Sequence, residues 1–144
     1  MTYLAHLSVN GGQRARKIIL IVEDDKSIGE LLALALTQES EYQPVVTRSS
    51  KQALGVISQV KPDLLLIDYY LQRGNGLDLY DQILAMQGFE DIPAVFLTMG
   101  DEQLQPLFEQ RHLAVLEKPF DLDSLFQVIE EHMHLLDPAG CAIS

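Results

Sequence analysis

Apolar residues follow two patterns along the chain: short continuous runs, and longer stretches with an apolar residue every three or four positions. A continuous run rich in β-branched residues predicts a strand that is covered on both faces. A period of about 3.6 residues predicts a helix with one buried face. The predicted strands are residues 18–22, 45–47, 64–67, 94–97 and 113–116. A helical segment follows each of them.

Helix-starting residues mark several of these helical segments. Ser49 or Ser50 is predicted to cap the second helix, and Asp121 the last one. Pro106 predicts that the fourth helix either begins near that residue or is distorted there, because proline lacks the N–H that a helix interior requires. The predicted buried face of the first helix comprises Ile28, Leu31, Leu32, Ala35 and Leu36, and that of the last Leu122, Leu125, Phe126, Ile129, Met133 and Leu136.

The alternation of strands and helices predicts a fold class. Strands that are apolar on both faces and alternate with helices form a parallel sheet with helices on each side, joined by right-handed crossovers. We therefore expect a doubly wound α/β fold with a five-stranded parallel sheet. Residues 17–136 are expected to form this one domain, with a flexible N-terminal extension at 1–16 and a C-terminal tail at 137–144.

Composition and charge exclude several classes of function. The formal net charge of −11 argues against direct nucleic-acid binding, because such surfaces are usually basic. The single cysteine, Cys141, has no partner for an intramolecular disulfide, which suits a reducing compartment and points to the cytoplasm. The first sixteen residues show neither a basic start followed by an apolar block nor a stretch long enough to span a bilayer, so no membrane insertion is expected.

Polar side chains follow four of the predicted strands. In an open α/β sheet, sites form outside the carboxyl ends of the strands. The residues at these ends are Glu23, Asp24, Asp25, Asp68, Thr98 and Lys118. Crowded carboxylates need a counter-charge, and Mg²⁺ suits Asp24 and Asp68 because it prefers oxygen ligands. An aspartate can also attack phosphorus to form an aspartyl phosphate, with Lys118 and Thr98 offsetting charge on the phosphoryl oxygens.

Four stretches of the sequence carry a family resemblance, in this order: "ILIVEDD", "DLLLIDYYLQRGNGLDLYDQI", "PAVFLT" and "VLEKPFDLDSLFQVI". Over residues 17–136 the chain resembles the receiver domain of two-component response regulators. The resemblance implies a flavodoxin-like (βα)5 fold and phosphorelay signalling. It also implies phosphorylation by a sensor histidine kinase or a phosphotransfer protein, and an output protein that the sequence does not identify.

The resemblance assigns roles to individual residues. Asp68 corresponds to the phosphoacceptor, and Asp24 to a direct Mg²⁺ ligand. Glu23 would act through a coordinated water, and the backbone carbonyl of Tyr70 would complete the protein ligands. By the same resemblance Asp25 is not required to be acidic, and we interpret it as a solvent-facing bystander.

The resemblance also identifies the residues of a conformational switch, one of which differs from the family pattern. Thr98 and Lys118 would each contact a phosphoryl oxygen, and the Lys118–Pro119 bond is expected to be cis. Val115 stands where the family usually has Tyr or Phe, so the usual coupling of threonine to an aromatic ring is not expected. Tyr70 and Met99 are bulky beside the acceptor, and we expect them to slow loss of the phosphoryl group.

Three functions remain open at this point. The favoured one is a phosphoacceptor receiver module that signals through its fourth helix, fifth strand and fifth helix and is not a turnover enzyme. A chain of this length leaves no room for a DNA-binding or output-enzyme domain, so we expect either a stand-alone receiver, which is slightly favoured, or a piece of a longer protein. The first alternative is a pseudo-receiver that binds proteins without phosphorylation, as Val115 and Met99 would allow. The second is an aspartyl-phosphate phosphatase, which would want an acid where Tyr70 stands.

Overall fold

The structure is a computed structural model that describes residues 16–135. The predicted extension and tail lie outside these residues, apart from Arg16. The strands are β1 (Ile18–Val22), β2 (Gln43–Thr47), β3 (Leu64–Asp68), β4 (Ala94–Thr98) and β5 (Ala114–Glu117). The helices of this region are α2 (Lys26–Glu39), α3 (Ser50–Val60), α4 (Gly76–Leu84), α5 (Gln105–Gln110) and α6 (Leu122–Leu135).

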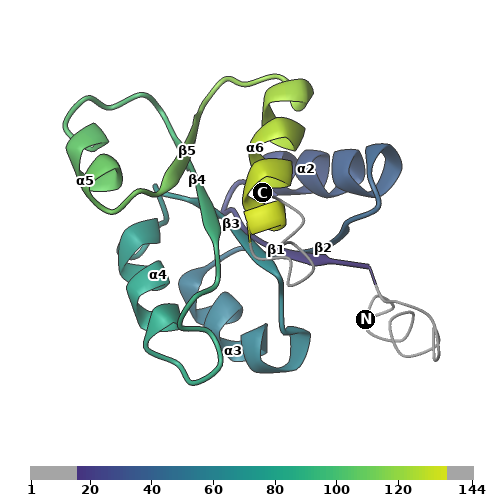
Figure 1. The fold of residues 1–144 in the computed structure, drawn as a ribbon, viewed down its shortest axis with the longest axis horizontal. Helices are drawn as coiled ribbons and strands as arrows, with labels where there is room; N and C mark the ends of the chain where they lie inside the picture. The colour runs from purple at the N-terminus through teal and green to yellow at the C-terminus, as the bar shows by residue number, and fades with distance from the viewer. Residues whose placement is uncertain (1–15, 136–144) are drawn as a thin grey trace.

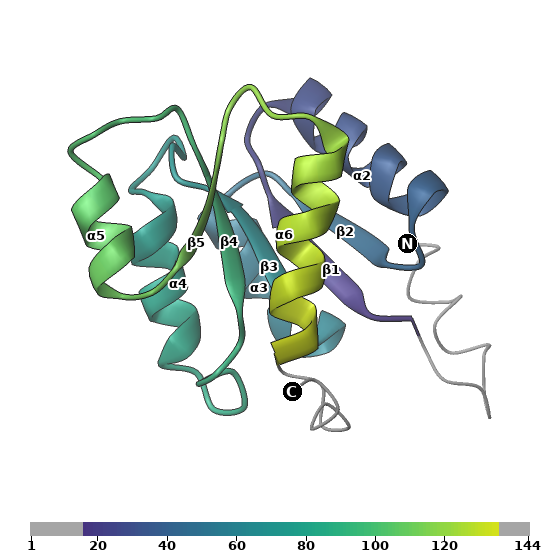
Figure 2. The same ribbon diagram turned by 45° about the horizontal axis from the view of Figure 1, so that its top comes forward.

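The five strands form one parallel sheet in the order β2-β1-β3-β4-β5. Helices α2 and α6 cover one face of the sheet, and α3 and α4 cover the other (Figures 1 and 2). The short helix α5 adds Phe108 to the α3 and α4 side. The predicted doubly wound α/β fold is therefore confirmed.

The continuous apolar runs follow from this double coverage. In β1, Ile19 and Ile21 pack toward α2 and α6, whereas Leu20 and Val22 pack toward α3 and α4. Every residue of β1, β3 and β4 is buried. The edge strand β2 contains Pro44, which an edge position tolerates because one side of the strand needs no N–H donor.

Most predicted helix starts agree with the structure. The Ser49 side chain accepts a hydrogen bond from Gln52 N, and Asp121 Oδ1 accepts one of 2.7 Å from Ser124 N. Pro106 lies in the first turn of α5. Helix α2 begins at Lys26, two residues before the predicted apolar face, because Asp25 caps it by accepting a hydrogen bond from Ile28 N.

Two residues predicted to lie on the buried faces of helices are exposed. Leu31 is 60% exposed because Gly29 belongs to the buried face of α2 and moves the centre of that face away from Leu31. Leu122, the first residue of α6, is 39% exposed. None of the helices in the described part of the chain has the length and apolarity needed to cross a membrane.

Candidate functional site

The order of the strands brings Glu23 and Asp68 together. The chain runs from β1 outward to β2 and then returns to β3 on the other side of β1, so the strand order changes direction between β1 and β3. Val22 is paired with Ile67; Glu23 directly follows β1, and Asp68 is the last residue of β3. Ligand sites in open α/β sheets form above such a switch point.

Three carboxylates converge at this point. One oxygen each from Glu23, Asp24 and Asp68 lies within 4.8 Å of the others. Within residues 16–135 this is the one group of three side chains arranged to hold a metal ion. Glu23 is 1% exposed and Asp68 3%, whereas Asp24 is partly exposed and opens the cluster to solvent.

Lys118 supplies the opposing charge from the end of β5. Its Nζ lies 3.2 Å from Glu23 Oε1 and 3.2 Å from Asp68 Oδ2. The backbone of Lys118 is fixed as well, because its N–H donates a 2.7 Å hydrogen bond to the carbonyl oxygen of Thr98. The Lys118–Pro119 peptide bond is cis, as expected from the sequence.

Backbone N–H groups hold the remaining carboxylate oxygens. Tyr70 N donates to Asp68 Oδ1 at 2.9 Å, and Asp25 N donates to Glu23 Oε2 at 3.2 Å. Each of the two buried carboxylates is therefore fixed by one backbone donor and by Lys118. Such charge-assisted bonds are about twice as strong as neutral ones, which gives the acceptor a defined orientation.

The electrostatics of the cluster are unbalanced. Burial, followed by the hydrogen bond and the charge of Asp68, raises the pKa of Glu23 to about 7, although Asp25 N–H and Lys118 act in the opposite direction. Burial acts to lower the pKa of Lys118. The negative charges and hydrogen bonds of Asp68 and Glu23 have a larger effect together, so the pKa of Lys118 is raised. Three carboxylates against one lysine leave an excess of negative charge, which favours binding of a cation.

The donor set fits Mg²⁺. This ion takes oxygen ligands, commonly one or two carboxylates with waters, and all three side chains of the cluster present carboxylate oxygens. The partly exposed Asp24 leaves a solvent-facing side for the waters that Mg²⁺ retains. The predicted ligands Glu23, Asp24 and Asp68 are thus brought together. The role of the Tyr70 carbonyl stays a prediction.

Thr98 and Val115 lie on the neighbouring strands β4 and β5. Thr98 is the last residue of β4 and is buried. The preceding residue, Leu97, is paired with Asp68 of β3. Gly100 N approaches Thr98 Oγ1 at 3.5 Å. Val115 is 38% exposed on β5 and lines the same cavity as Thr98. Its role in switching stays a prediction.

Sequence reasoning missed the supporting contacts of two residues. Asp25 was interpreted as a bystander, but it caps α2 and donates its N–H to Glu23. Gly76 begins α4, and its N–H donates a 2.8 Å hydrogen bond to Tyr69 O. A Cβ on Gly76 would lie 2.7 Å from the backbone oxygen of Asp68, so glycine lets α4 approach the acceptor. Glycine in the turn motif "RGNG" was the available signal.

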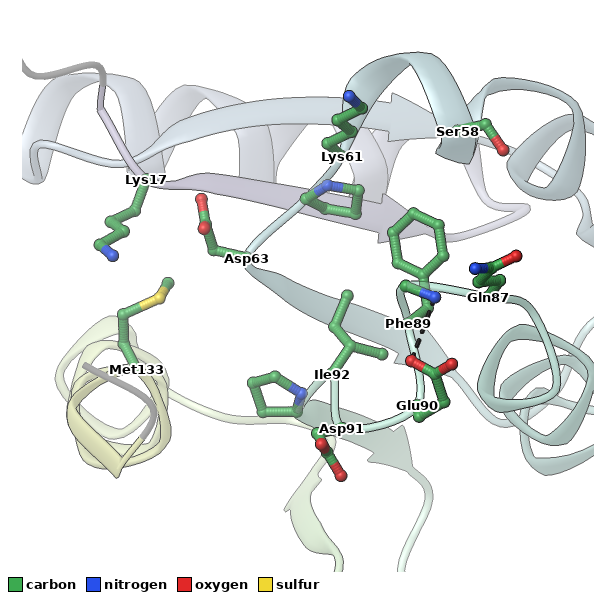
Figure 3. Close-up of a pocket in the computed structure, with 13 residues that line it drawn as sticks. Lys17, Ser58, Lys61, Asp63, Gln87, Phe89, Glu90, Asp91, Ile92 and Met133 are labelled. Atoms are coloured by element: carbon green, nitrogen blue, oxygen red, sulfur yellow. Dashed lines mark hydrogen bonds between the residues drawn. The ribbon is translucent and has the colours of Figure 1, made fainter. Parts of the chain in front are cut away.

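A cavity of about 610 Å³, larger than the one lined by Thr98 and Val115, lies at the end of the sheet opposite to the acid cluster (Figure 3). Asp63 lines it, but its carboxylate is already used as the acceptor of a 2.7 Å hydrogen bond from Ile18 N. Glu90 accepts a hydrogen bond from Gly88 N in the same way. None of the predicted site residues lines this cavity. Its size therefore does not make it the chemical centre.

Comparison with known proteins identifies the family. Residues 19–130 match the sequence profile of the response regulator receiver domain. The chain belongs to this receiver domain family. The resemblance seen in the sequence motifs and the five-stranded fold are both confirmed, and receiver domains are components of two-component systems.

Individual relatives agree with this assignment. The chain is 30% identical over 123 residues to the transcriptional regulatory protein GlrR of Escherichia coli, covering 84% of this chain and 27% of GlrR. It is 30% identical over 122 residues to the E. coli phosphate regulon regulator PhoB, covering 83% of this chain and 53% of PhoB. The chain thus spans about a quarter to a half of the length of these curated relatives.

Solved structures give the same result. The non-phosphorylated HemR receiver domain from Leptospira biflexa is 30% identical, with a TM-score of 0.72, and the match covers 85% of this chain and 98% of that one. A response regulator described as putative, from Chloroflexus aurantiacus, is 26% identical with a TM-score of 0.75, covering 82% and 98% of the two chains.

Proposed function

We propose that this chain is a phosphoacceptor module in which Mg²⁺-dependent phosphorylation of Asp68 changes the binding of a partner protein. The observation that carries the proposal is the pair of contacts from Lys118 to Asp68 and Glu23, each 3.2 Å long. Lysine held against an otherwise acidic cluster can offset the charge of an incoming phosphoryl group.

Asp68 is the nucleophile of the proposed reaction. One carboxylate oxygen attacks phosphorus, the new O–P bond forms, and the P–N bond to the donor's histidine breaks. The electron pair of that bond returns to the imidazole, which takes a proton from solvent. Tyr70 N and Lys118 Nζ orient the two oxygens of Asp68 before attack. Preorganised donors of this kind lower a barrier because they need no rearrangement during the reaction.

Glu23, Asp24 and Asp68 would hold Mg²⁺, with the carbonyl of Tyr70 as a further ligand. When bound, the ion would supply positive charge to the phosphoryl oxygens. The Thr98 hydroxyl lies at the end of the adjacent strand and would donate a hydrogen bond to a phosphoryl oxygen. The phosphorylated state would then differ from the free state at Thr98, from which a change can pass to β5.

The phosphoryl donor in this proposal is a sensor histidine kinase or a phosphotransfer protein. The output partner would read the surface formed by α5, β5 and α6. We propose the cytoplasm as the compartment, because a single cysteine suits a reducing environment. The chain would act as a signalling domain that gains and loses its own phosphoryl group, not as an enzyme that turns over a metabolite.

The pseudo-receiver alternative is favoured by one observation, the aliphatic Val115 on β5. It predicts partner binding that is independent of Asp68. The phosphatase alternative requires a second acid two residues after the nucleophile Asp68, but Tyr70 holds that position. Turnover of a simple phosphate ester would favour it.

Intact mass measurement after incubation with acetyl phosphate and Mg²⁺ tests the proposal. We expect the wild type to gain the mass of one phosphoryl group and Asp68→Asn to gain none. Asp25→Asn is the matched control. It makes the same chemical change at the residue that caps α2, after the strand next to β3, and asparagine can still cap a helix. Absence of an adduct in the wild type with acetyl phosphate and other small phosphodonors would favour the pseudo-receiver.

A further inference from the structure

A small cavity opens between α5 and β5. Its volume is about 300 Å³. Leu104, Phe108, Leu113 and Val115 form its apolar lining, and Thr98 lies in its wall. A volume at the low end of the range for small-molecule pockets suits one side chain better than a cofactor.

The charged residues that line this cavity are all acidic. Asp101, Glu109 and Glu117 contribute carboxylates, and no lysine, arginine or histidine belongs to the lining. Local contacts position these carboxylates. Gln105 Nε2 donates to Glu109 Oε2 at 2.8 Å, and Gln103 N donates to Asp101 Oδ1 at 3.0 Å.

Gly100 shapes the rim. It has a φ of 80°, and a Cβ there would lie 2.7 Å from the carboxyl carbon of Glu117. Glycine therefore lets the Glu117 carboxylate lie against the turn that follows Thr98. The result is an apolar hollow with a negative rim, and Thr98 lies in its wall.

We infer that this cavity receives an apolar side chain, preferably aromatic, from a partner segment that carries lysine or arginine on either side of it. The inference rests on the proposed function and names the chemistry of the output partner. The acidic rim favours basic residues on either side of the inserted side chain, because their charges are complementary. The apolar lining favours an apolar side chain in the cavity itself. A single anchoring side chain in a desolvated pocket commonly dominates the affinity of a protein interface. Thr98, the predicted hydrogen-bond donor to the phosphoryl group, lies in the wall of the cavity, so the occupant would lie where it can respond to the state of the acceptor.

NMR titration of the full chain with three capped tripeptides tests the inference: Arg-Phe-Arg, Arg-Ser-Arg and Glu-Phe-Glu. The readout is the methyl shifts of Leu104, Leu113 and Val115. We expect saturable shifts with Arg-Phe-Arg that weaken as salt increases, since exposed charges are screened. The other two peptides should bind several-fold more weakly. Equal shifts with Glu-Phe-Glu, or no saturable shift with Arg-Phe-Arg, would overturn the inference.

Two glutamates provide a matched pair of variants. Glu109 and Glu131 each accept a hydrogen bond from a glutamine four residues earlier, but Glu131 lies on α6 and does not line the cavity. Glu109→Gln should weaken Arg-Phe-Arg binding by roughly two- to fivefold, the range for one exposed charge pair. Glu131→Gln should leave it unchanged. Val115→Phe should fill the cavity from within and abolish binding. Equal affinities for the two glutamate variants would contradict the role of the rim.

Acetyl phosphate and mass measurement on the same samples separate this inference from the proposed function. Peptide binding without phosphorylation of Asp68 would remove the phosphoacceptor proposal and leave the cavity as a binding site. Phosphorylation without peptide binding would remove the cavity inference alone.

Discussion

Gly76→Ala is the change that most directly tests how closely α4 approaches the acceptor. A Cβ at Gly76 would lie 2.7 Å from the backbone oxygen of Asp68 and 2.8 Å from a methyl group of Ile67. One of these atoms is backbone and the other belongs to a fully buried residue, so neither can move freely. The added methyl group must therefore push α4 away from the end of β3.

The magnitude follows from packing. Inserting a methyl group into a filled site costs typically about 1–3 kcal/mol, so we expect the free energy of unfolding to fall by that amount. Gly55 is the matched control, because it lies in the interior of α3, is exposed, and has no atom within 4 Å of its Cβ position. Gly55→Ala should raise the free energy of unfolding by about 0.5–1 kcal/mol, the difference in helix propensity.

Urea unfolding followed by circular dichroism measures both changes. For a urea dependence of about 2 kcal/mol per molar, the midpoint should fall by roughly 0.5–1.5 M for Gly76→Ala and rise slightly for Gly55→Ala. The rate of phosphorylation by acetyl phosphate should fall only in Gly76→Ala, since the displaced α4 would weaken the hydrogen bond from Gly76 N to Tyr69 O beside the acceptor. Equal stability of the two variants would refute the argument from close approach.

Three further predictions concern the acid site and its neighbours. In chelator-treated protein, Glu23 keeps a proton to about pH 7 that the unfolded chain releases near pH 4.5, so the free energy of unfolding should fall as pH rises between these values. Glu23→Gln should remove that slope in urea titrations at several pH values. Tyr70→Asn and Met99→Ala should each speed the loss of the phosphoryl group several-fold in timed mass measurements, and unchanged decay would contradict the shielding role. Asp25→Ala should lower the free energy of unfolding by about 1 kcal/mol through loss of the helix cap, whereas Asp25→Asn should keep it in thermal unfolding.

Much of the fold was readable from local pattern. The five apolar runs became the five strands within two residues at either end, and the predicted caps Ser49 and Asp121 accept the expected hydrogen bonds. These features depend on residues close together in the chain, which is why period and capping chemistry reveal them. The prediction failed at Leu31, where burial depends on which part of α2 faces the sheet.

The composition of the acid site was also determined by the sequence, because the carboxyl ends of parallel strands meet at one edge. Its contacts were not. Lys118 bridges Glu23 and Asp68, which are 95 and 50 residues away along the chain, and only the packing of β5 beside β4 sets those distances. The raised pKa of Glu23, the capping contact of Asp25 and the acidic rim beside Thr98 likewise required the tertiary structure. Periodicity reports which face of an element is buried, whereas the strength of a charge interaction depends on distances between elements that no local pattern encodes.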